Sequence, residues 1–114
     1  MNVPASHVLL IEDDLKIVEL LSSLLENDSI TLDQATSGAE ALALTRKNQF
    51  DLILLDLGLP DTNGFELLKK LKEQPETESV PVIVLTAWNG TQDKLKGFEL
   101  GADDYVTKPF EAAE

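Results

Sequence analysis

Residues 50–64 read FDLILLDLGLPDTNG, and this stretch decides the fold of the chain. The apolar run at 52–55 is too short for a typical helix and has the profile of a strand buried on both faces of a parallel sheet. A single carboxylate, Asp56, ends the run, and turn-forming residues follow as far as Gly64. Open α/β sheets hold their chemistry at this position, beside a loop at the carboxyl end of a strand. Taken alone, Asp56 fits equally well the simpler role of capping the next turn.

The rest of the chain alternates strand and helix patterns around this centre. Short apolar runs predict interior strands at 8–11 and 82–85, and weaker patterns predict an edge strand at 30–35 and a last strand at 104–107. Helical spacing follows each of the first four strands, and Leu95 and Phe98 are expected to face inward from the last helix. This alternation predicts parallel pairing and right-handed crossovers, hence an open, doubly wound α/β sheet with helices on both faces.

Several polar residues are expected to have local structural roles. Ser37 and Glu40 have the spacing of a capping box at the start of the second helix. Asp14 is expected to cap the first helix rather than bind a metal, and Gly101 is expected to end the last helix. His7, the only histidine, is expected to be a surface residue without partners.

Length and composition narrow the class of protein. The chain has 114 residues and 43% apolar content, which fits a single domain with a proper core. Its net charge of −12 predicts repulsion from nucleic acid and from anionic membranes, so direct binding to either is not expected. No apolar run approaches the roughly 20 residues that span a bilayer, and the start, MNVPASH, lacks the features of a signal peptide. A cytoplasmic location is therefore expected. The absence of cysteine excludes disulfides and thiolate metal sites.

Reactive side chains come at the carboxyl ends of four predicted strands. The first strand leads to Glu12 and Asp13, the central strand to Asp56, the next to Thr86 and the last to Lys108. Because the carboxyl ends of parallel strands lie on one edge of a sheet, these side chains are expected to converge. Four such coincidences are much harder to explain as caps and surface charges than one.

The chemistry that these groups suit is phosphoryl transfer. Glu12, Asp13 and Asp56 offer the oxygen ligands that Mg²⁺ prefers, with Mn²⁺ as an alternative ion. Asp56 can then act as a nucleophile and form an acyl phosphate. Lys108 supplies a positive charge for one phosphoryl oxygen, and the Thr86 hydroxyl can donate to another.

Four motifs, VLLIEDD, LLDLGLPDTNG, VLTA and YVTKPF, closely resemble in order and spacing the receiver domain of two-component response regulators. The resemblance covers nearly the whole chain, so residues 1–114 are identified as one receiver domain. It implies a flavodoxin-like or CheY-like fold with strand order 2-1-3-4-5, the order found in the chemotaxis receiver CheY. It also implies a signalling function, in which a histidine kinase or phosphotransfer protein donates a phosphoryl group from a phosphohistidine.

The resemblance assigns the phosphoacceptor and the metal ligands. Asp56 matches the residue that takes the phosphoryl group. Asp13 matches the direct Mg²⁺ ligand, and Glu12 matches the acid that acts through water. Gly58 matches the position that ligates through its backbone carbonyl, a role that tolerates any side chain.

The resemblance also assigns a switch. Thr86, followed by Ala87, matches the hydroxyl residue that moves towards the phosphoryl group, and Lys108 matches the lysine that binds it. Tyr105 matches the aromatic that turns inward with this movement, although from the residues alone a place at the edge of the core is the better interpretation. The peptide bond between Lys108 and Pro109 is expected to be cis.

Two features depart from the family pattern. Trp88 is bulky for the mouth of the site, and it is expected to restrict the water that hydrolyses the acyl phosphate. The full last helix of the family is missing or truncated, because residues 110–114 suffice for about one turn. We therefore expect a fragment of a longer regulator or hybrid kinase, with an output domain or partner protein downstream. The alternative is an oligomer that covers the exposed sheet face. The resemblance also implies that a dimer linked to phosphorylation can form.

Other functions stay open at this point. A pseudo-receiver would bind partners without phosphotransfer, but such proteins usually lose an acid, the threonine or the lysine, and all are present here. A phosphatase of the haloacid dehalogenase class needs a second Asp two residues after its nucleophile, where this chain has Gly58. Flavodoxin-like nucleotide binding would need a glycine-rich phosphate loop after the first strand, and this chain has none. The domain is thus not expected to be an enzyme beyond catalysing its own phosphorylation and dephosphorylation.

Overall fold

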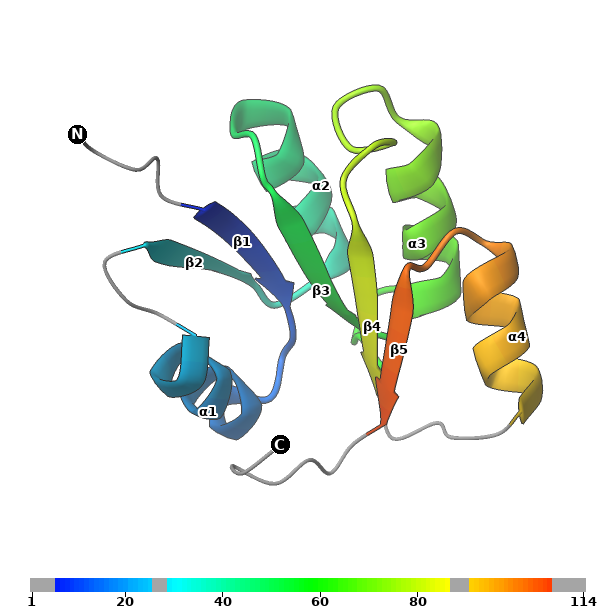
Figure 1. Ribbon diagram of the computed structural model, residues 1–114, viewed down its shortest axis with the longest axis horizontal. Helices are drawn as coiled ribbons and strands as arrows, with labels where there is room; N and C mark the ends of the chain where they lie inside the picture. Colours follow the sequence, from blue (N-terminus) through cyan, green and yellow to red (C-terminus); the bar gives the residue numbers. More distant parts are fainter. Residues whose placement is uncertain (1–5, 26–28, 87–90, 108–114) are drawn as a thin grey trace.

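The computed structural model describes residues 6–25, 29–86 and 91–107, which form a parallel sheet between two layers of helix (Figure 1). The elements in chain order are β1 (Ser6–Ile11), α1 (Leu15–Leu25), β2 (Ile30–Ala35), α2 (Gly38–Lys47), β3 (Leu52–Asp56), α3 (Gly64–Glu73), β4 (Val82–Thr86), α4 (Thr91–Glu99) and β5 (Asp104–Thr107). The strand order is β2-β1-β3-β4-β5, and all neighbouring strands are parallel. The predicted doubly wound sheet in the order 2-1-3-4-5 is confirmed.

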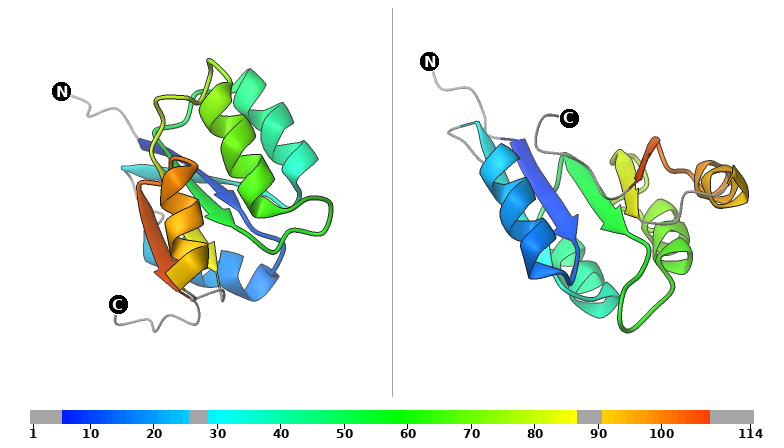
Figure 2. Two further views of the ribbon diagram at one scale, coloured as in Figure 1. Left: turned by 90° about the vertical axis from the view of Figure 1, so that its right-hand side faces the viewer. Right: turned by 90° about the horizontal axis from the view of Figure 1, so that it is seen from below.

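Alternate residues of the interior strands pack into two separate cores, as the period of two in a strand requires. Leu9 of β1 and Leu55 of β3 belong to the core that contains α2 and α3, whereas Leu10 and Leu54 belong to the core that contains α1. Figure 2 shows α1 on one side of the sheet and α2, α3 and α4 on the other. Burying one such side chain contributes about 1.5–3 kcal/mol, so a slip of β3 by one residue would be costly on both faces.

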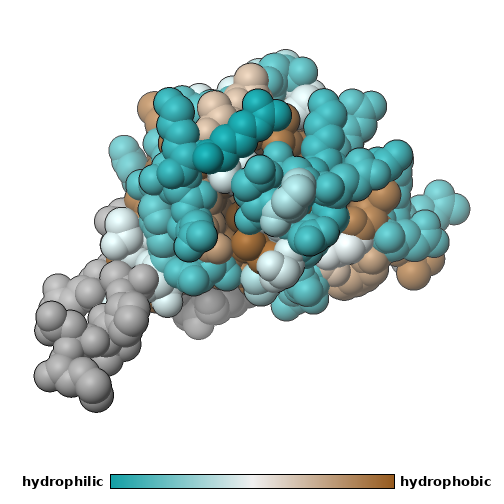
Figure 3. Space-filling model, turned by 90° about the horizontal axis from the view of Figure 1, so that it is seen from above, coloured by the Kyte–Doolittle hydropathy of each residue, from teal (hydrophilic) through white to brown (hydrophobic). Residues whose placement is uncertain are grey.

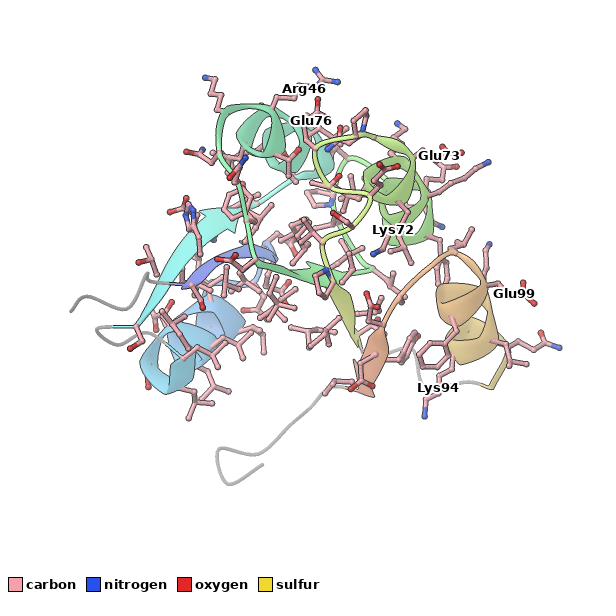
Figure 4. All side chains as sticks on the ribbon, turned by 45° about the horizontal axis from the view of Figure 1, so that its top comes forward. Arg46, Lys72, Glu73, Glu76, Lys94 and Glu99 are labelled. Atoms are coloured by element: carbon pink, nitrogen blue, oxygen red, sulfur yellow. The ribbon has the colours of Figure 1, made fainter. Side chains whose placement is uncertain are left out.

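Helix α4 differs from the prediction, because Leu95 and Phe98 do not face inward. Their side chains are 57% and 47% exposed. The residue of α4 that faces the sheet is Gly97, where an added Cβ would lie 3.2 Å from the Tyr105 ring. The helix lies beside the sheet's last strand, and this close approach at Gly97 leaves Leu95 and Phe98 on its outer sides. Glu99 projects from α4 away from the sheet (Figure 4).

The prediction for His7 was wrong in one respect: the side chain is partly exposed, but it has partners. Its Nε2 lies 2.7 Å from Oδ2 of Asp33, and its ring packs against Phe50 with centroids 4.4 Å apart. Both partners are far away in the sequence, so no local pattern reveals them. His7 belongs to the end of the molecule where the strands begin, and hydrophilic side chains predominate on the surface there (Figure 3).

The expected helix ends are present. Ser37 Oγ accepts the Glu40 N–H at 3.2 Å, and Glu40 in turn accepts the Thr36 N–H at 2.7 Å. Gly101 follows α4 with φ of 105°, a left-handed conformation that favours glycine. The prediction of a truncated last helix concerns residues outside the described ranges. Among the described residues, no helix is both long and apolar enough to cross a membrane.

Candidate functional site

The topology brings three predicted site segments to the same edge of the sheet. Glu12 and Asp13 follow β1, Asp56 is the last residue of β3, and Thr86 is the last residue of β4. β3 lies between β1 and β4, so its carboxyl end is central (Figure 1). The register pairs Asp56 with Leu85, which places Thr86 one residue beyond it on the neighbouring strand. The predicted convergence is confirmed for these segments.

The three acids form a cluster that can hold a metal ion. Glu12, Asp13 and Asp56 each offer a carboxylate oxygen, and these oxygens all lie within 4.8 Å of one another. Oxygens bound to one Mg²⁺ at about 2.1 Å are about 3 Å apart when adjacent and about 4 Å apart when opposite. The separation therefore fits one divalent ion after a small adjustment, with water filling the other positions. Like charges this close also favour a cation on electrostatic grounds.

The burial of the cluster is uneven. Glu12 is 1% exposed and Asp56 is 7% exposed, whereas Asp13 lies at the surface. Backbone groups help to orient the buried pair: the Asp14 N–H points to Glu12 Oε2 at 3.4 Å, and the Gly58 N–H donates to Asp56 Oδ1 at 3.3 Å. Asp13 is therefore the member of the cluster that is most open to solvent.

Asp14 is not part of this cluster, because its carboxylate is hydrogen-bonded at the start of α1. Its Oδ1 accepts the Lys16 N–H at 2.9 Å, and its carbonyl accepts the Val18 N–H at 3.1 Å. These contacts cap the start of α1, which confirms the predicted role for Asp14.

The loop after Asp56 has a fixed shape. Gly64 donates its N–H to the Leu57 carbonyl at 3.0 Å, and Gly58 forms an isolated bridge with Asn63. A Cβ at position 64 would lie 2.3 Å from the Leu57 Cα, so only glycine fits this crossing. Asn63 then caps α3 by accepting the Phe65 N–H at 2.8 Å.

The two predicted switch residues are both buried. Thr86 is 1% exposed, and Tyr105 is 9% exposed. The Tyr105 ring lies against Gly97 of α4, and its centroid is 6.4 Å from that of the Phe98 ring. Burial and the nearby negative charge of Asp93 raise the pKa of the Tyr105 hydroxyl above 10.0. Tyr105 is thus part of the core in this structure, and its surroundings are those of a neutral phenol.

Four other predicted site residues lie outside the described ranges. These are Ala87 and Trp88 after β4, and Lys108 and Pro109 after β5. Their parts in phosphoryl binding, in the cis peptide bond and at the mouth of the site stay predictions.

From the sequence, Asp61 was interpreted only as a turn-forming residue, and its long-range contact was not predicted. Asp61 lies in the loop after Asp56, and its carboxylate accepts hydrogen bonds from the start of α2. Its partners are more than twenty positions away, so the sequence carries no local signal for this contact.

A comparison with known proteins decides the family. The model of the response regulator receiver domain matches residues 8–114, nearly the whole chain. The chain belongs to the response regulator receiver family. This receiver domain is therefore a component of two-component signalling, as the four motifs indicated.

Individual relatives agree with this assignment. The receiver domain is 44% identical over 108 residues to the DNA-binding dual master transcriptional regulator RpaA of Synechocystis sp. (strain ATCC 27184 / PCC 6803 / Kazusa). That match covers 95% of this chain and 45% of RpaA, so the chain spans less than half the length of this relative.

Two solved structures have the same fold. The non-phosphorylated HemR receiver domain from Leptospira biflexa is 42% identical, with a TM-score of 0.86 over 95% of this chain and 86% of that chain. The Mn²⁺-bound form of the response regulator Rcp1 is 30% identical, with a TM-score of 0.85 over 93% of this chain and 83% of that chain.

Proposed function

We propose that this receiver domain accepts a phosphoryl group on Asp56 from the phosphohistidine of a histidine kinase or phosphotransfer protein. The observation that supports this most strongly is the cluster of Glu12, Asp13 and Asp56 at the carboxyl edge of the sheet. Asp13, Asp56 and the Gly58 carbonyl would hold Mg²⁺ directly, and Glu12 would act through water. Mn²⁺ can take the same place, as the ion named for the related Rcp1 suggests.

The chemistry needs one nucleophile held in a fixed direction. An Asp56 carboxylate oxygen attacks the phosphorus atom, so an O–P bond forms as the N–P bond to the donor histidine breaks. The imidazole leaves with the electron pair and takes a proton from water. The Gly58 N–H holds Asp56 Oδ1 at 3.3 Å, which restrains rotation of the carboxylate during the attack. A bound Mg²⁺ neutralises the negative charge that otherwise repels the incoming phosphoryl group.

The response to phosphorylation involves residues on the neighbouring strands. The Thr86 hydroxyl and Lys108 bind oxygens of the new phosphoryl group, with Ala87 beside them, and Tyr105 moves as Thr86 shifts. Tyr105 contacts Gly97, so its movement is coupled to α4. This region would report the state of Asp56 to an output domain or partner.

We further propose that the chain is one domain of a longer cytoplasmic regulator or hybrid kinase. The support is that it spans less than half of a relative named as a transcriptional regulator. In this proposal the domain acts on no substrate other than its own aspartate.

The test is incubation with Mg²⁺ and acetyl phosphate, followed by intact mass spectrometry. We expect a gain of one phosphoryl group in the parent chain and none in Asp56→Asn. A chain that folds and binds partners but takes up no phosphoryl group would instead be a pseudo-receiver. Hydrolysis of a general phosphate ester with turnover would point to a phosphatase.

A further inference from the structure

The loop formed by residues 57–63 is attached to a helix that precedes it in the chain. Asp61 Oδ1 accepts the Gly38 N–H at 2.8 Å, and Oδ2 accepts the Ala39 N–H at 3.1 Å. These donors are the first two residues of α2. Both oxygens of one carboxylate therefore join the β3–α3 loop to α2. Figure 2 shows how far this loop extends beyond the end of β3.

Two side chains divide the capping of α2 between them. The first N–H groups of a helix have no partner within it, and here Ser37 satisfies that of Glu40 while Asp61 satisfies those of Gly38 and Ala39. A negative charge is favourable at this end of a helix. The same two N–H groups lower the pKa of Asp61 from its usual value, so its carboxylate is ionised at neutral pH.

A close contact accompanies these hydrogen bonds. A Cβ at position 38 would lie 2.6 Å from the Thr62 Cγ2, which is closer than carbon atoms approach. Glycine at position 38 therefore lets the loop lie directly on the start of α2. Asp61 and Thr62 are adjacent in the loop, so the hydrogen bonds and this contact attach the same part of the loop to the start of α2.

The loop held in this way includes the backbone beside Asp56. Gly58 precedes Asp61 by three positions and donates its N–H to Asp56 Oδ1 at 3.3 Å. At the base of the loop, Leu57 and Gly64 are joined by a backbone hydrogen bond of 3.0 Å. The base is thus closed by backbone contacts, and the tip is attached through Asp61.

We infer that Asp61 is a positioning residue for phosphoryl acceptance, which holds Gly58 in place beside Asp56 by attaching the loop to α2. The inference rests on the proposed function, in which the Gly58 carbonyl binds the cation. Without the Asp61 carboxylate, the tip of the loop separates from α2, and Gly58 occupies its working position for less of the time. Cation affinity and the rate of phosphorylation both decrease as a result.

Three variants of the full chain test this role: Asp61→Ala, Asp61→Asn and, as a matched control, Ser37→Ala. The control removes the other cap of α2 and leaves the loop contacts intact. The dissociation constant for Mg²⁺ is measured by calorimetry, the phosphorylation rate with acetyl phosphate by intact mass, and the Gly58 amide resonance by NMR without Mg²⁺.

We expect Asp61→Ala to weaken Mg²⁺ binding about tenfold, the lower end of the range for residues that support metal ligands. Phosphorylation slows, and the Gly58 resonance shifts. Asp61→Asn retains one acceptor oxygen and gives an intermediate result. Ser37→Ala keeps its Mg²⁺ affinity within about twofold of the parent, because the loop does not depend on it.

Several results would overturn the inference. One is an Asp61→Ala variant with the parent's Mg²⁺ affinity and an unmoved Gly58 resonance. Another is an equal loss in Ser37→Ala, which would assign the effect to the stability of α2. If Asp61→Ala does not fold, the same criteria apply to Asp61→Asn. A parent chain that neither binds Mg²⁺ nor takes up a phosphoryl group would overturn the proposed function as well, whereas an active parent with an indifferent Asp61 would remove this inference alone.

Discussion

Where the strands begin, acidic side chains are matched with donors, whereas where the strands end, acidic side chains are gathered together. Asp51 accepts the His7 N–H at 2.7 Å, and Asp103 accepts the Val82 N–H at 2.8 Å and lies 3.5 Å from Lys72 Nζ. At the other edge, Glu12, Asp13 and Asp56 bring their oxygens within 4.8 Å. The first arrangement stabilises the fold, whereas the second brings carboxylates together at a place where a divalent cation can bind.

The largest effect is expected for Asp13→Asn. Removal of this charge should weaken Mg²⁺ binding by at least tenfold, because a ligand matters more than the residues that support it. In the absence of Mg²⁺ the same variant should melt about 2 °C higher than the parent, because one repulsive charge is gone. Calorimetric titration and thermal unfolding in EDTA measure the two changes. A lower Tm in EDTA would show that Asp13 stabilises the empty fold.

Asp103→Ala tests the opposite edge. It removes the acceptor of the Val82 N–H, and a hydrogen bond of this kind contributes about 1 kcal/mol to the free energy of unfolding. The ion pair with Lys72 should add little, since the Asp103 side chain is 53% exposed. Urea unfolding measures the loss, and Mg²⁺ affinity should stay unchanged. Lys72→Met is a partial control: it keeps most of the apolar stem that lies beside Gly101, but it removes the charge together with the hydrogen bond that Lys72 Nζ donates to the Val80 carbonyl at 2.8 Å, so its loss is an upper limit for the ion pair.

A smaller, pH-dependent effect is expected for Asp61→Asn. The folded-state pKa of Asp61 is lowered from 3.8, so its carboxylate contributes stability that is fully present well above pH 3.8. This contribution is lost as the pH falls through the lower folded-state value. The difference in unfolding free energy between parent and variant should therefore be larger at pH 7 than at pH 3. Added salt should reduce it, since the group is exposed. A difference that is constant with pH would mean that its charge has no part in the contact.

The smallest effect is expected for the pair formed by His7 and Asp33. Their side chains are 28% and 40% exposed, so a double-mutant cycle with alanine should give a coupling of about 0.5 kcal/mol. A coupling energy above the roughly 1 kcal/mol expected for Asp103→Ala would reverse the ranking of these two interactions.

Much of the site can be predicted from the sequence, because the burial pattern of the strands and their parallel pairing are enough to place most of its residues. Alternating burial identifies the strands, and parallel pairing then places Glu12, Asp56 and Thr86 on one edge whatever the loops do. Caps such as Asp14 are also local, since donor and acceptor are two positions apart.

The contacts that were missed depend on how distant segments meet. His7 with Asp33, and Asp61 with Gly38, join residues 26 and 23 positions apart, and their side chains fit several simpler roles. The exposure of Leu95 and Phe98 has a related cause, because helical spacing does not indicate that Gly97 is the point of contact. Helical periodicity defines a face but does not identify the surface against which it packs.

The division of β3 between two cores has a consequence for how a signal leaves the site. Ile53 and Leu55 pack into one layer and Leu54 into the other, so a tilt or slide of this strand would disturb both cores at once. We therefore expect β3 to move less than the neighbouring strands when a group is added at its end. In the proposed function, a displacement that begins at Asp56 would therefore pass to Thr86 and Tyr105 on the neighbouring strands and from there to α4, while the centre of the sheet stays unchanged.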